Sequence, residues 1–405
     1  MRPHPQDAPQ ALLAGLCESG ALHGTHAARP QRWHRLAARR GQPLLVPVDA
    51  PRFAAAAIRF FIGTRPRQWL AQARLAWADH ARQVLELPGF PVAALFNQPG
   101  QVAPRDLRLA LCCGSPGPLR KLVVLAAPAG SDPEAPHARD ALRVAKIAMA
   151  ASADRAIEHE AHWLRLLGRQ AATARFVPRL YNEGRLGNGR RFVVMSALPR
   201  GRASHAFGTC HGDFLAALGR PGRTLGPWPC SEAYCRLRAR CAALAGLVEP
   251  EALRPLREAL DAIERGLART ALPTCIAHGD FAPWNMRLAA GQLFVFDWEY
   301  AQADANPLHD YLHFHVMTRI AAGRALRAAW LRDLLAGAGR HGAAVFGATV
   351  APALAKAAPL LLAQYLVDTI SFYAQQSGYL DARHPVLRPQ LRLLAARRHW
   401  CAEAA

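Results

Sequence analysis

Apolar and polar residues change their spacing along this chain, and the spacing predicts two kinds of structure. In residues 51–87 the apolar side chains recur every three to four positions with arginines between them, which predicts helix interrupted near Gly63 to Pro66. Residues 1–33 show no sustained period, and we expect no regular structure there. From about residue 106 the pattern changes to short β-rich runs.

Two hairpins are predicted in the next hundred residues. DLRLALCC and LRKLVVLAA flank GSPGP, and RLYNEGRL and RRFVVMSAL flank GNGR. ALRVAKIAMA predicts a further strand, and ADRAIEHEAHWLRLLGRQ has helical spacing. From Pro199 onwards the pattern is mostly helical. We therefore predict an α+β, two-lobed fold with a partly helical N-terminal extension (1–100), a small β-rich lobe (101–198) and a larger helical lobe (199–405).

The charge of the chain is high, but its make-up argues against nucleic acid as the partner. The formal net charge is +21 over 405 residues. Only Lys121, Lys146 and Lys356 are lysines, and the arginines are spread along the chain without a basic repeat interleaved with aromatic residues. A general attraction to acidic surfaces accounts for this pattern. The basic amphipathic segment 51–87 fits two interpretations, packing on its own protein or peripheral contact with a membrane or partner.

Cysteine usage and hydropathy favour a cytoplasmic protein. The nine cysteines form no CxxC pair or zinc-ligand spacing, so we expect reduced, mostly buried thiols. The first residues, MRPHPQDAPQ, lack the apolar core of a signal peptide. Gln364 and Asp368 interrupt the most apolar stretch near the C-terminus, AAPLLLAQYLVDTISFYA, which argues against a membrane span.

The tetrapeptide HGDF occurs twice, at residues 211–214 and 278–281, and the residues after each copy distinguish the two. Asn285 stands five residues after Asp280, and Asp297 ends the apolar run LFVF. A carboxylate, an amide and a second carboxylate make an oxygen-ligand set that suits Mg²⁺. The first copy has Leu218 at the corresponding position. We interpret Asp213 as a helix-start residue that caps backbone amides.

HGDFAPWN followed by FDWE resembles the catalytic loop and metal motif of the aminoglycoside phosphotransferase and choline kinase family. Members of this family are small-molecule kinases with a protein-kinase-like fold, so the resemblance implies ATP and Mg²⁺ as cofactors. It implies Asp280 as the catalytic base, Asn285 and Asp297 as metal ligands, and His278 as a support of the loop. We expect Asp310, in NPLHDYLHF, to cap or brace a helix near the metal loop.

The same resemblance extends upstream to a nucleotide site. Lys146 in RVAK stands where the family has its strand-three lysine, and a helix glutamate that pairs with this lysine falls at Glu160, with Glu158 as an alternative two residues away. GSPGP takes the place of the phosphate-covering loop, although it has fewer glycines than a standard kinase loop. The implied nucleotide-binding residues are Lys146, Glu160, Gly114, Ser115 and Gly117.

The sequence favours a small-molecule hydroxyl as the phosphate acceptor. DWEY leads directly to DANPLHDYLHF, which leaves no room for the activation segment of a protein kinase. After Asp310 only four acids face ten arginines and Lys356, so a neutral or anionic acceptor such as a sugar or glycan precursor is favoured. A cationic acceptor of the aminoglycoside or choline type, and a catalytically weak nucleotide-binding scaffold, are the alternatives.

Overall fold

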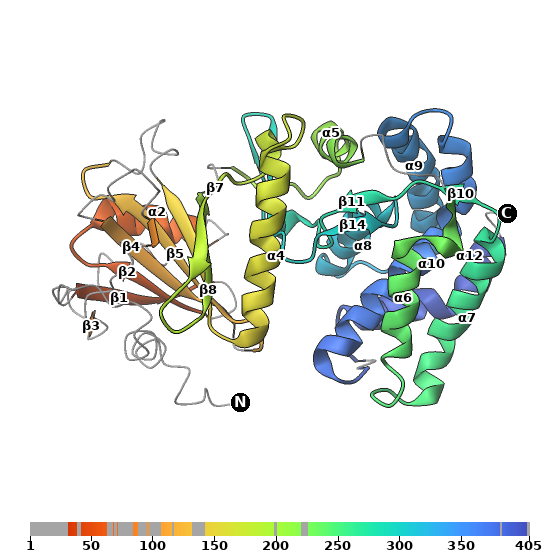
Figure 1. The fold of residues 1–405 in the computed structure, drawn as a ribbon, viewed down its shortest axis with the longest axis horizontal. Helices are drawn as coiled ribbons and strands as arrows, with labels where there is room; N and C mark the ends of the chain where they lie inside the picture. The colour runs from red at the N-terminus through yellow and green to blue at the C-terminus, as the bar shows by residue number, and fades with distance from the viewer. Residues whose placement is uncertain are drawn as a thin grey trace. The chain divides into compact units, whose positions relative to one another are not determined.

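The computed structural model describes most of the chain beyond residue 30. The described residues are 31–38, 42–62, 68, 71, 84–87, 95–96, 107–115, 117–131, 142–197, 201–219, 226–380 and 383–402. The chain divides into two compact units, Met1–Pro199 and Arg200–Ala405, whose elements are labelled in Figure 1. The predicted α+β, two-lobed fold is therefore confirmed, since strands dominate unit 1 and helices dominate unit 2.

Unit 1 is built around one antiparallel sheet with the strand order β3-β1-β2-β4-β5-β6-β8-β7. Its elements are β1 (Gln31–Ala37), β2 (Pro43–Pro47), α2 (Pro51–Phe61), β3 (Val84–Leu87), β4 (Leu107–Cys113), β5 (Lys121–Pro128), β6 (Arg143–Ala148), α4 (Ala151–Gly168), η6 (Ala174–Phe176), β7 (Leu180–Arg185) and β8 (Arg191–Ser196). Both predicted hairpins, β4–β5 and β7–β8, are present.

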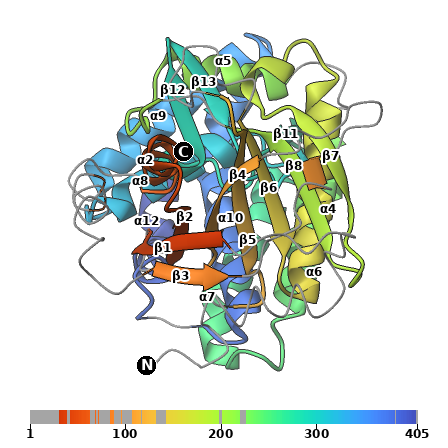
Figure 2. The ribbon, with the colours of Figure 1, turned by 90° about the vertical axis from the view of Figure 1, so that its left-hand side faces the viewer.

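Helices α2 and α4 pack on this sheet. The helix α4 contacts β6, β7 and β8, as can be followed in Figure 2, while α2 contacts β2 and β4. Side chains at alternate positions of β4 and β5 are buried in the core of unit 1, among them Leu109, Leu111 and Val124. The helix predicted across 151–168 follows from apolar positions such as Ile157, Ala161 and Leu164, which are all buried on one side.

The N-terminal residues differ from the prediction. Residues 31–37 form β1 and residues 43–47 form β2, and β2 pairs with β4 at Leu44↔Cys112 and Leu45↔Leu111. The sheet thus joins residues that the sequence pattern divided between an extension and a lobe. The helix at 51–61 is confirmed, but Val84–Leu87 is the strand β3 rather than helix, because its backbone pairs with β1. The other residues of the predicted 51–87 helix, except positions 62, 68 and 71, lie outside the described residues.

Unit 2 combines helices with three small two-stranded sheets. The helices are α5 (Thr209–Leu218), α6 (Glu232–Ala242), α7 (Pro250–Leu267), α8 (His309–Ala321), α9 (Ala328–Phe346), α10 (Ala351–Ser377), α11 (Leu387–Ala395) and α12 (Arg397–Ala402), with the short η7 (Trp228–Cys230) and η8 (Pro283–Asn285). The strands are β9 (Gly226–Pro227), β10 (Ala271–Leu272), β11 (Cys275–Ala277), β12 (Met286–Ala289), β13 (Gln292–Val295) and β14 (Gln302–Ala305). Antiparallel pairing joins β9 to β10, β11 to β14 and β12 to β13.

Helix α10 is the centre of unit 2. It contacts α6, α7, α8, α9, α11 and α12. Among the described residues it is the one helix whose length and composition would allow it to cross a membrane, yet 72% of its most apolar window is buried inside the protein. Most of its apolar residues therefore contribute to the core of unit 2.

The cysteines of the described residues carry free thiols. Cys112, Cys113 and Cys275 are buried, whereas Cys230 and Cys235 are exposed, so the expectation of mostly buried thiols is only partly met. Burial raises the pKa of Cys112 to about 12, and the neighbouring Cys113 contributes to this rise. Such a thiol is a packing residue rather than a nucleophile.

Candidate active site

Unit 1 contains a lysine–glutamate pair at the predicted nucleotide site. Lys146 on β6 places its Nζ 2.6 Å and 2.8 Å from the two carboxylate oxygens of Glu160 on α4. The side chain of Glu160 is fully buried and that of Lys146 is 12% exposed. Glu158, the alternative partner, instead pairs with Arg191 on β8 and is half exposed. Two residues on a helix that are two positions apart point about 200° from each other, so only one of the two glutamates can face β6.

The GSPGP loop connects β4 to β5, and β5 is the neighbour of β6, the strand that carries Lys146. Gly114 donates its N–H to the carbonyl of Lys121 (2.8 Å), and a Cβ at position 114 would lie 2.7 Å from that oxygen, so only glycine fits. Gly117 has φ +140° and is exposed, which again favours glycine. Gln42, just before β2, donates to the hydroxyl of Ser115 (2.6 Å). The residue that precedes β2 thus contacts the loop.

In unit 2 the second HGDF forms a tight loop after β11. His278 is fully buried, and its ring spans the loop. Its Nδ1 accepts the N–H of Asp280 (3.2 Å), and its Nε2 donates to the carbonyl of Phe296 (3.0 Å). Gly279 has φ +83°, and a Cβ there would overlap the carbonyl of Tyr300. The motif therefore requires glycine for its backbone and histidine for its bracing.

Asp280 and Asn285 lie against each other at the end of this loop. The Nδ2 of Asn285 donates both to the Oδ2 of Asp280 (2.7 Å) and to its backbone carbonyl (3.0 Å). Trp284 Nε1 lies 3.4 Å from the same Oδ2. Because both partners of Asn285 are acceptors, its amide nitrogen must face them, and the amide oxygen Oδ1 is left for other ligands.

Asp297 follows β13 and reaches the same loop through its neighbour. The N–H of Phe296 donates to the carbonyl of Asn285 (3.0 Å), while the carbonyl of Phe296 accepts from His278. Asp297 itself has φ +72°, a left-handed conformation that aspartate tolerates better than most residues. Non-glycine residues in this region cluster at functional sites.

The hydroxyl of Tyr300 is affected by the charges of both aspartates. Burial raises the pKa of its hydroxyl well above the usual range, and the charges of Glu299, Asp297 and Asp280 contribute to this rise. Both carboxylates are therefore within electrostatic reach of one hydroxyl group. Among the described residues, no group of three or more His, Cys, Asp or Glu side chains is placed to hold a metal ion. The amide oxygen of Asn285 and the carboxylate of Asp297 are ligands of the kind that Mg²⁺ takes, with further oxygens from water and phosphate.

Asp310, in the first turn of α8, braces the HGDF loop, and not a helix as the sequence led us to expect. Its Oδ2 accepts the N–H of His278 (2.6 Å), and its Oδ1 accepts the N–H of Gly279 (3.1 Å). The side chain is 5% exposed, so these are charge-assisted bonds in a largely dry environment. The conformation of the loop is thus fixed from α8 as well as from within.

One partner of Asp280 was not predicted from the sequence. His313, one turn after Asp310 on α8, places its Nε2 2.9 Å from the Oδ1 of Asp280. Its Nδ1 lies 3.3 Å from the hydroxyl of Tyr365 on α10. The signal available in the sequence was the i, i+3 spacing from Asp310, which puts both side chains on one face of a helix.

The first HGDF has a different local structure. It lies inside α5, and Asp213 is an exposed mid-helix residue rather than the predicted cap. The capping contact comes from His211, whose Nδ1 accepts the N–H of Gly208 (3.1 Å). The expected assignment of Asp213 to the helix start was wrong because α5 begins four residues earlier, at Thr209.

Comparison with known proteins identifies relatives of this chain. The model of the phosphotransferase enzyme family matches residues 137–346, which include Lys146, Glu160 and the whole second HGDF loop. A search of curated proteins finds no match.

Solved structures also resemble the chain at low sequence identity. A thermostable mutant of aminoglycoside phosphotransferase APH(4)-Ia, in a ternary complex with ADP and hygromycin B, is 14% identical with a TM-score of 0.47, over 74% of this chain and 95% of the other. ADP-bound APH(2″)-Ib is 14% identical with a TM-score of 0.44, over 75% and 96%. The GDP and kanamycin complex of APH(2″)-IIIa is 12% identical with a TM-score of 0.45, over 76% and 97%.

Proposed function

This chain belongs to the phosphotransferase enzyme family, and we propose that it transfers the γ-phosphoryl group of ATP to a hydroxyl group of a small metabolite. The hydroxyl oxygen forms a bond to the γ-phosphorus, the bond from that phosphorus to the β-γ bridging oxygen breaks, and ADP leaves. This chemistry demands positioning and charge neutralisation more than covalent catalysis. The observation that carries the proposal is the bonding of Asp280 to Asn285 through both its carboxylate and its carbonyl oxygen.

Asp280 is the proposed catalytic base. Its carboxylate orients the acceptor hydroxyl and takes the proton that this group loses as it attacks phosphorus. The side chain is about a quarter exposed, at 28%, so it is accessible to an acceptor although its neighbours in the loop are buried. His278 is the proposed support, because it ties the backbone of Asp280 to Phe296.

Asn285 and Asp297 are the proposed ligands of Mg²⁺. Asn285 offers its amide oxygen because its nitrogen is engaged by Asp280. Asp297 offers a carboxylate, and the preceding residue Phe296 is bonded to the loop through both its N–H and its carbonyl group. A bound Mg²⁺ supplies neutralisation of the charge on the nucleotide phosphates.

Lys146 and Glu160 are the proposed nucleotide contacts of unit 1. An ammonium group held by a fully buried carboxylate is a fixed point charge, which suits the α- and β-phosphates. Of the three lysines, Lys146 lies within β6, while Lys121 is the first residue of β5. Gly114, Ser115 and Gly117 are proposed to approach the phosphates through backbone amides and the serine hydroxyl.

We favour a neutral or anionic acceptor, such as a sugar or glycan precursor. The segment after Asp310 carries ten arginines and Lys356 against four acids, and this balance opposes a polycation. One of these acids is also engaged, because Asp368 pairs with Arg240 at 2.6 Å. A cationic acceptor would therefore find little negative charge in this segment.

The two HGDF copies supply a matched pair of variants for the test. Purified protein is incubated with Mg²⁺ and ATP and a panel of sugars, amino alcohols and aminoglycosides, and phosphorylated product is measured by mass spectrometry. We expect a product with the wild type, a loss of about 10²–10⁴-fold in kcat for Asp280→Ala, and an unchanged rate for Asp213→Ala. Both changes remove an aspartate from the same tetrapeptide, and only Asp280 lies in the proposed site.

Two outcomes would contradict the proposal. A wild-type protein that binds ATP but forms no product with any acceptor would favour the nucleotide-binding scaffold. Equal rates for Asp280→Ala and wild type would remove Asp280 as the base. If aminoglycosides alone are phosphorylated, the proposed kinase activity stands, but the preference for an anionic or neutral acceptor is wrong.

A further inference from the structure

The carboxylate of Asp280 is held from two directions. Asn285 donates to Oδ2 from within the loop, while His313 contacts Oδ1 from α8 at 2.9 Å. The residue His313 is 5% exposed, so its ring is almost completely withdrawn from water. The same helix holds the loop backbone through Asp310, one turn earlier. One face of α8 therefore fixes both the backbone and the side chain of the proposed base.

The hydrogen-bond polarity of this arrangement follows from its members. A carboxylate only accepts hydrogen bonds, so the Nε2 of His313 must carry the proton that faces Asp280. A neutral imidazole then has Nδ1 as an acceptor, and the hydroxyl of Tyr365 lies 3.3 Å away to donate to it. Burial of Tyr365 raises the pKa of its hydroxyl, which keeps this proton in place. The hydrogen bonds therefore all run one way: the Tyr365 hydroxyl donates to His313, and His313 donates to Asp280.

From this geometry we infer that His313 is a positioning residue for Asp280, and that Tyr365 in turn holds His313. The inference rests on the proposed function of Asp280. Without His313, the carboxylate would keep its bonds from Asn285 and Trp284 on one oxygen only, and it would be free to turn Oδ1 away from the acceptor. The two residues come from α8 and α10, so the core helices of unit 2 set the orientation of a loop side chain.

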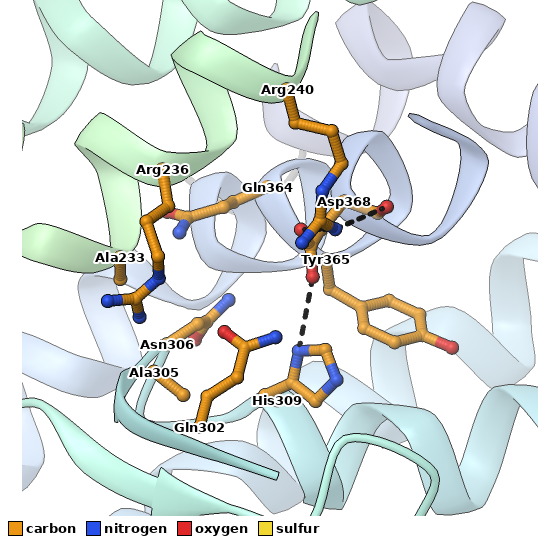
Figure 3. A pocket seen from close by; sticks show the side chains of 10 residues that line it. All are labelled: Ala233, Arg236, Arg240, Gln302, Ala305, Asn306, His309, Gln364, Tyr365 and Asp368. Carbon is orange, nitrogen blue, oxygen red and sulfur yellow. Dashed lines mark hydrogen bonds and ion pairs between the residues drawn. The ribbon is translucent and has the colours of Figure 1, made fainter. Parts of the chain in front are cut away.

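The surroundings of the pair indicate support rather than contact with the acceptor. Tyr365 and His309 line a pocket together with Arg236, Arg240 and Asp368, and Figure 3 shows Asp368 between Arg240 and His309. The pocket has about 10 Å³ of free space, room for roughly one water molecule. His309 stacks on His313 with nearly parallel rings, 6.0 Å between centroids. This pocket beside Tyr365 is therefore a poor fit for a hydroxylated metabolite.

Two substitutions at position 313 separate positioning from packing. His313→Gln retains an N–H donor at the distance of Nε2, whereas His313→Leu fills similar space without a donor. We expect His313→Leu to lower kcat by about 10- to 100-fold with the KM for ATP changed less than about twofold, and His313→Gln to recover most of that loss. His315→Gln, on the same helix but on the Phe207 side, is the control and should leave kcat unchanged.

Tyr365→Phe tests the second bond of the chain. Removal of this hydroxyl should lower kcat by up to about tenfold in the wild-type background and have no further effect in His313→Leu, since the two residues act in series. Equal kcat values for His313→Leu and wild type, or equal losses with Leu and Gln at matched melting temperatures, would overturn the inference. If the losses of kcat add in the double variant His313→Leu, Tyr365→Phe, then Tyr365 does not act through His313.

A measurement without turnover separates this inference from the proposed function. Imidazole ¹⁵N spectra of the wild type, with the His313 signals assigned by their loss in His313→Gln, report which ring nitrogen is protonated. We expect protonation at Nε2, and protonation at Nδ1 alone would overturn the inference even in an active enzyme. A wild type with protonated Nε2 but no kinase activity would instead overturn the proposed function, and with it the catalytic purpose of the bond.

Discussion

At the scale of single residues, Glu160 is a fully buried acid of unit 1. Its side chain has no exposure to solvent, and both carboxylate oxygens contact the ammonium of Lys146. A buried charge that loses its partner is strongly unfavourable, so the two residues must be kept together. Glu160 is proposed to contribute to the nucleotide site by fixing the position of the Lys146 ammonium group.

Glu160→Gln should weaken nucleotide binding, and Glu158→Gln is its matched control. The amide keeps the shape of Glu160 but removes the charge that holds Lys146, and we expect the Kd for the Mg²⁺ complex of a nonhydrolysable ATP analogue to rise by roughly tenfold. Glu158 is half exposed and paired with Arg191, so Glu158→Gln should leave this Kd unchanged. Isothermal titration calorimetry measures both, and equal losses would contradict the assignment.

Sequence spacing predicted the residues of the site that lie close together along the chain. Asp280 and Asn285 are five residues apart on one loop, and local spacing is enough to find them. His313 has no local spacing to Asp280, because their contact spans 33 residues, and only its i, i+3 spacing from Asp310 pointed to it. The first HGDF differs from the second, as expected, but local sequence placed Asp213 at a helix start whereas it lies inside α5.

At the scale of elements, unit 2 contains a cluster of histidines between α5, α8 and α9. The ring of Phe207 contacts His211, Tyr311, Phe314, His315 and His341. Burial lowers the pKa of His341 to about 4, and the nearby His315 contributes to this fall. Burial also lowers the pKa of His315 to about 4, with an added contribution from His211. These rings are neutral in the folded protein at neutral pH.

Unit 2 should therefore lose stability in acid between about pH 6.5 and about pH 4. Above pH 6.5 the histidines are neutral in both states and have no effect, whereas below it the unfolded chain takes up protons that the folded cluster excludes. Each such histidine lowers the free energy of unfolding by up to roughly 1.4 kcal/mol per pH unit in this window. Urea unfolding at a series of pH values measures the slope.

The variant His341→Phe isolates the cluster in that experiment. Phenylalanine can keep the ring stacking on Tyr311, now 4.8 Å between centroids, without a titrating nitrogen. We expect its stability to fall less steeply with decreasing pH than that of the wild type. The same slope in both proteins would assign the acid sensitivity to other groups.

The predictability of elements follows the range of their contacts. The hairpins β4–β5 and β7–β8 and the helix α4 are local structures, and the sequence predicted all three. β2 reaches β4 across more than 60 residues, and its strand PLLVP shows no alternation of apolar and polar residues that would mark it. Burial on both faces removes that alternation, so the pairing could not be recognised from the pattern.

At the scale of the whole molecule, the N-terminal residues are part of the core of unit 1. Trp33 and Leu45 belong to the same buried cluster as Leu109, Leu111 and Val124. Phe53 of α2 is fully buried as well. Deletion of these elements would expose one side of β4, which carries the loop proposed to cover the phosphates.

A chain shortened to begin at Gly63 should fold less stably than one that begins at Gln31. The longer chain keeps β1, β2 and α2, whereas the shorter one loses about 2 kcal/mol of burial for each large apolar side chain removed, including Leu44, Leu45 and Ile58. That sum is comparable with the whole stability of a domain, so we expect aggregation or a strongly lowered Tm. Circular dichroism melting compares the two, and equal Tm values would show that these strands are dispensable.

The scarcity of lysine gives this chain a simple response to amine-selective chemistry. Lys121 and Lys356 are the only other lysine side chains, and Lys146 is shielded, with 12% of its side chain exposed. Acylating reagents therefore meet few competing targets, and a modified Lys146 marks a molecule in which its contact with Glu160 has opened. Mass spectrometry of the labelled protein can follow that opening against a background of only two other lysine sites.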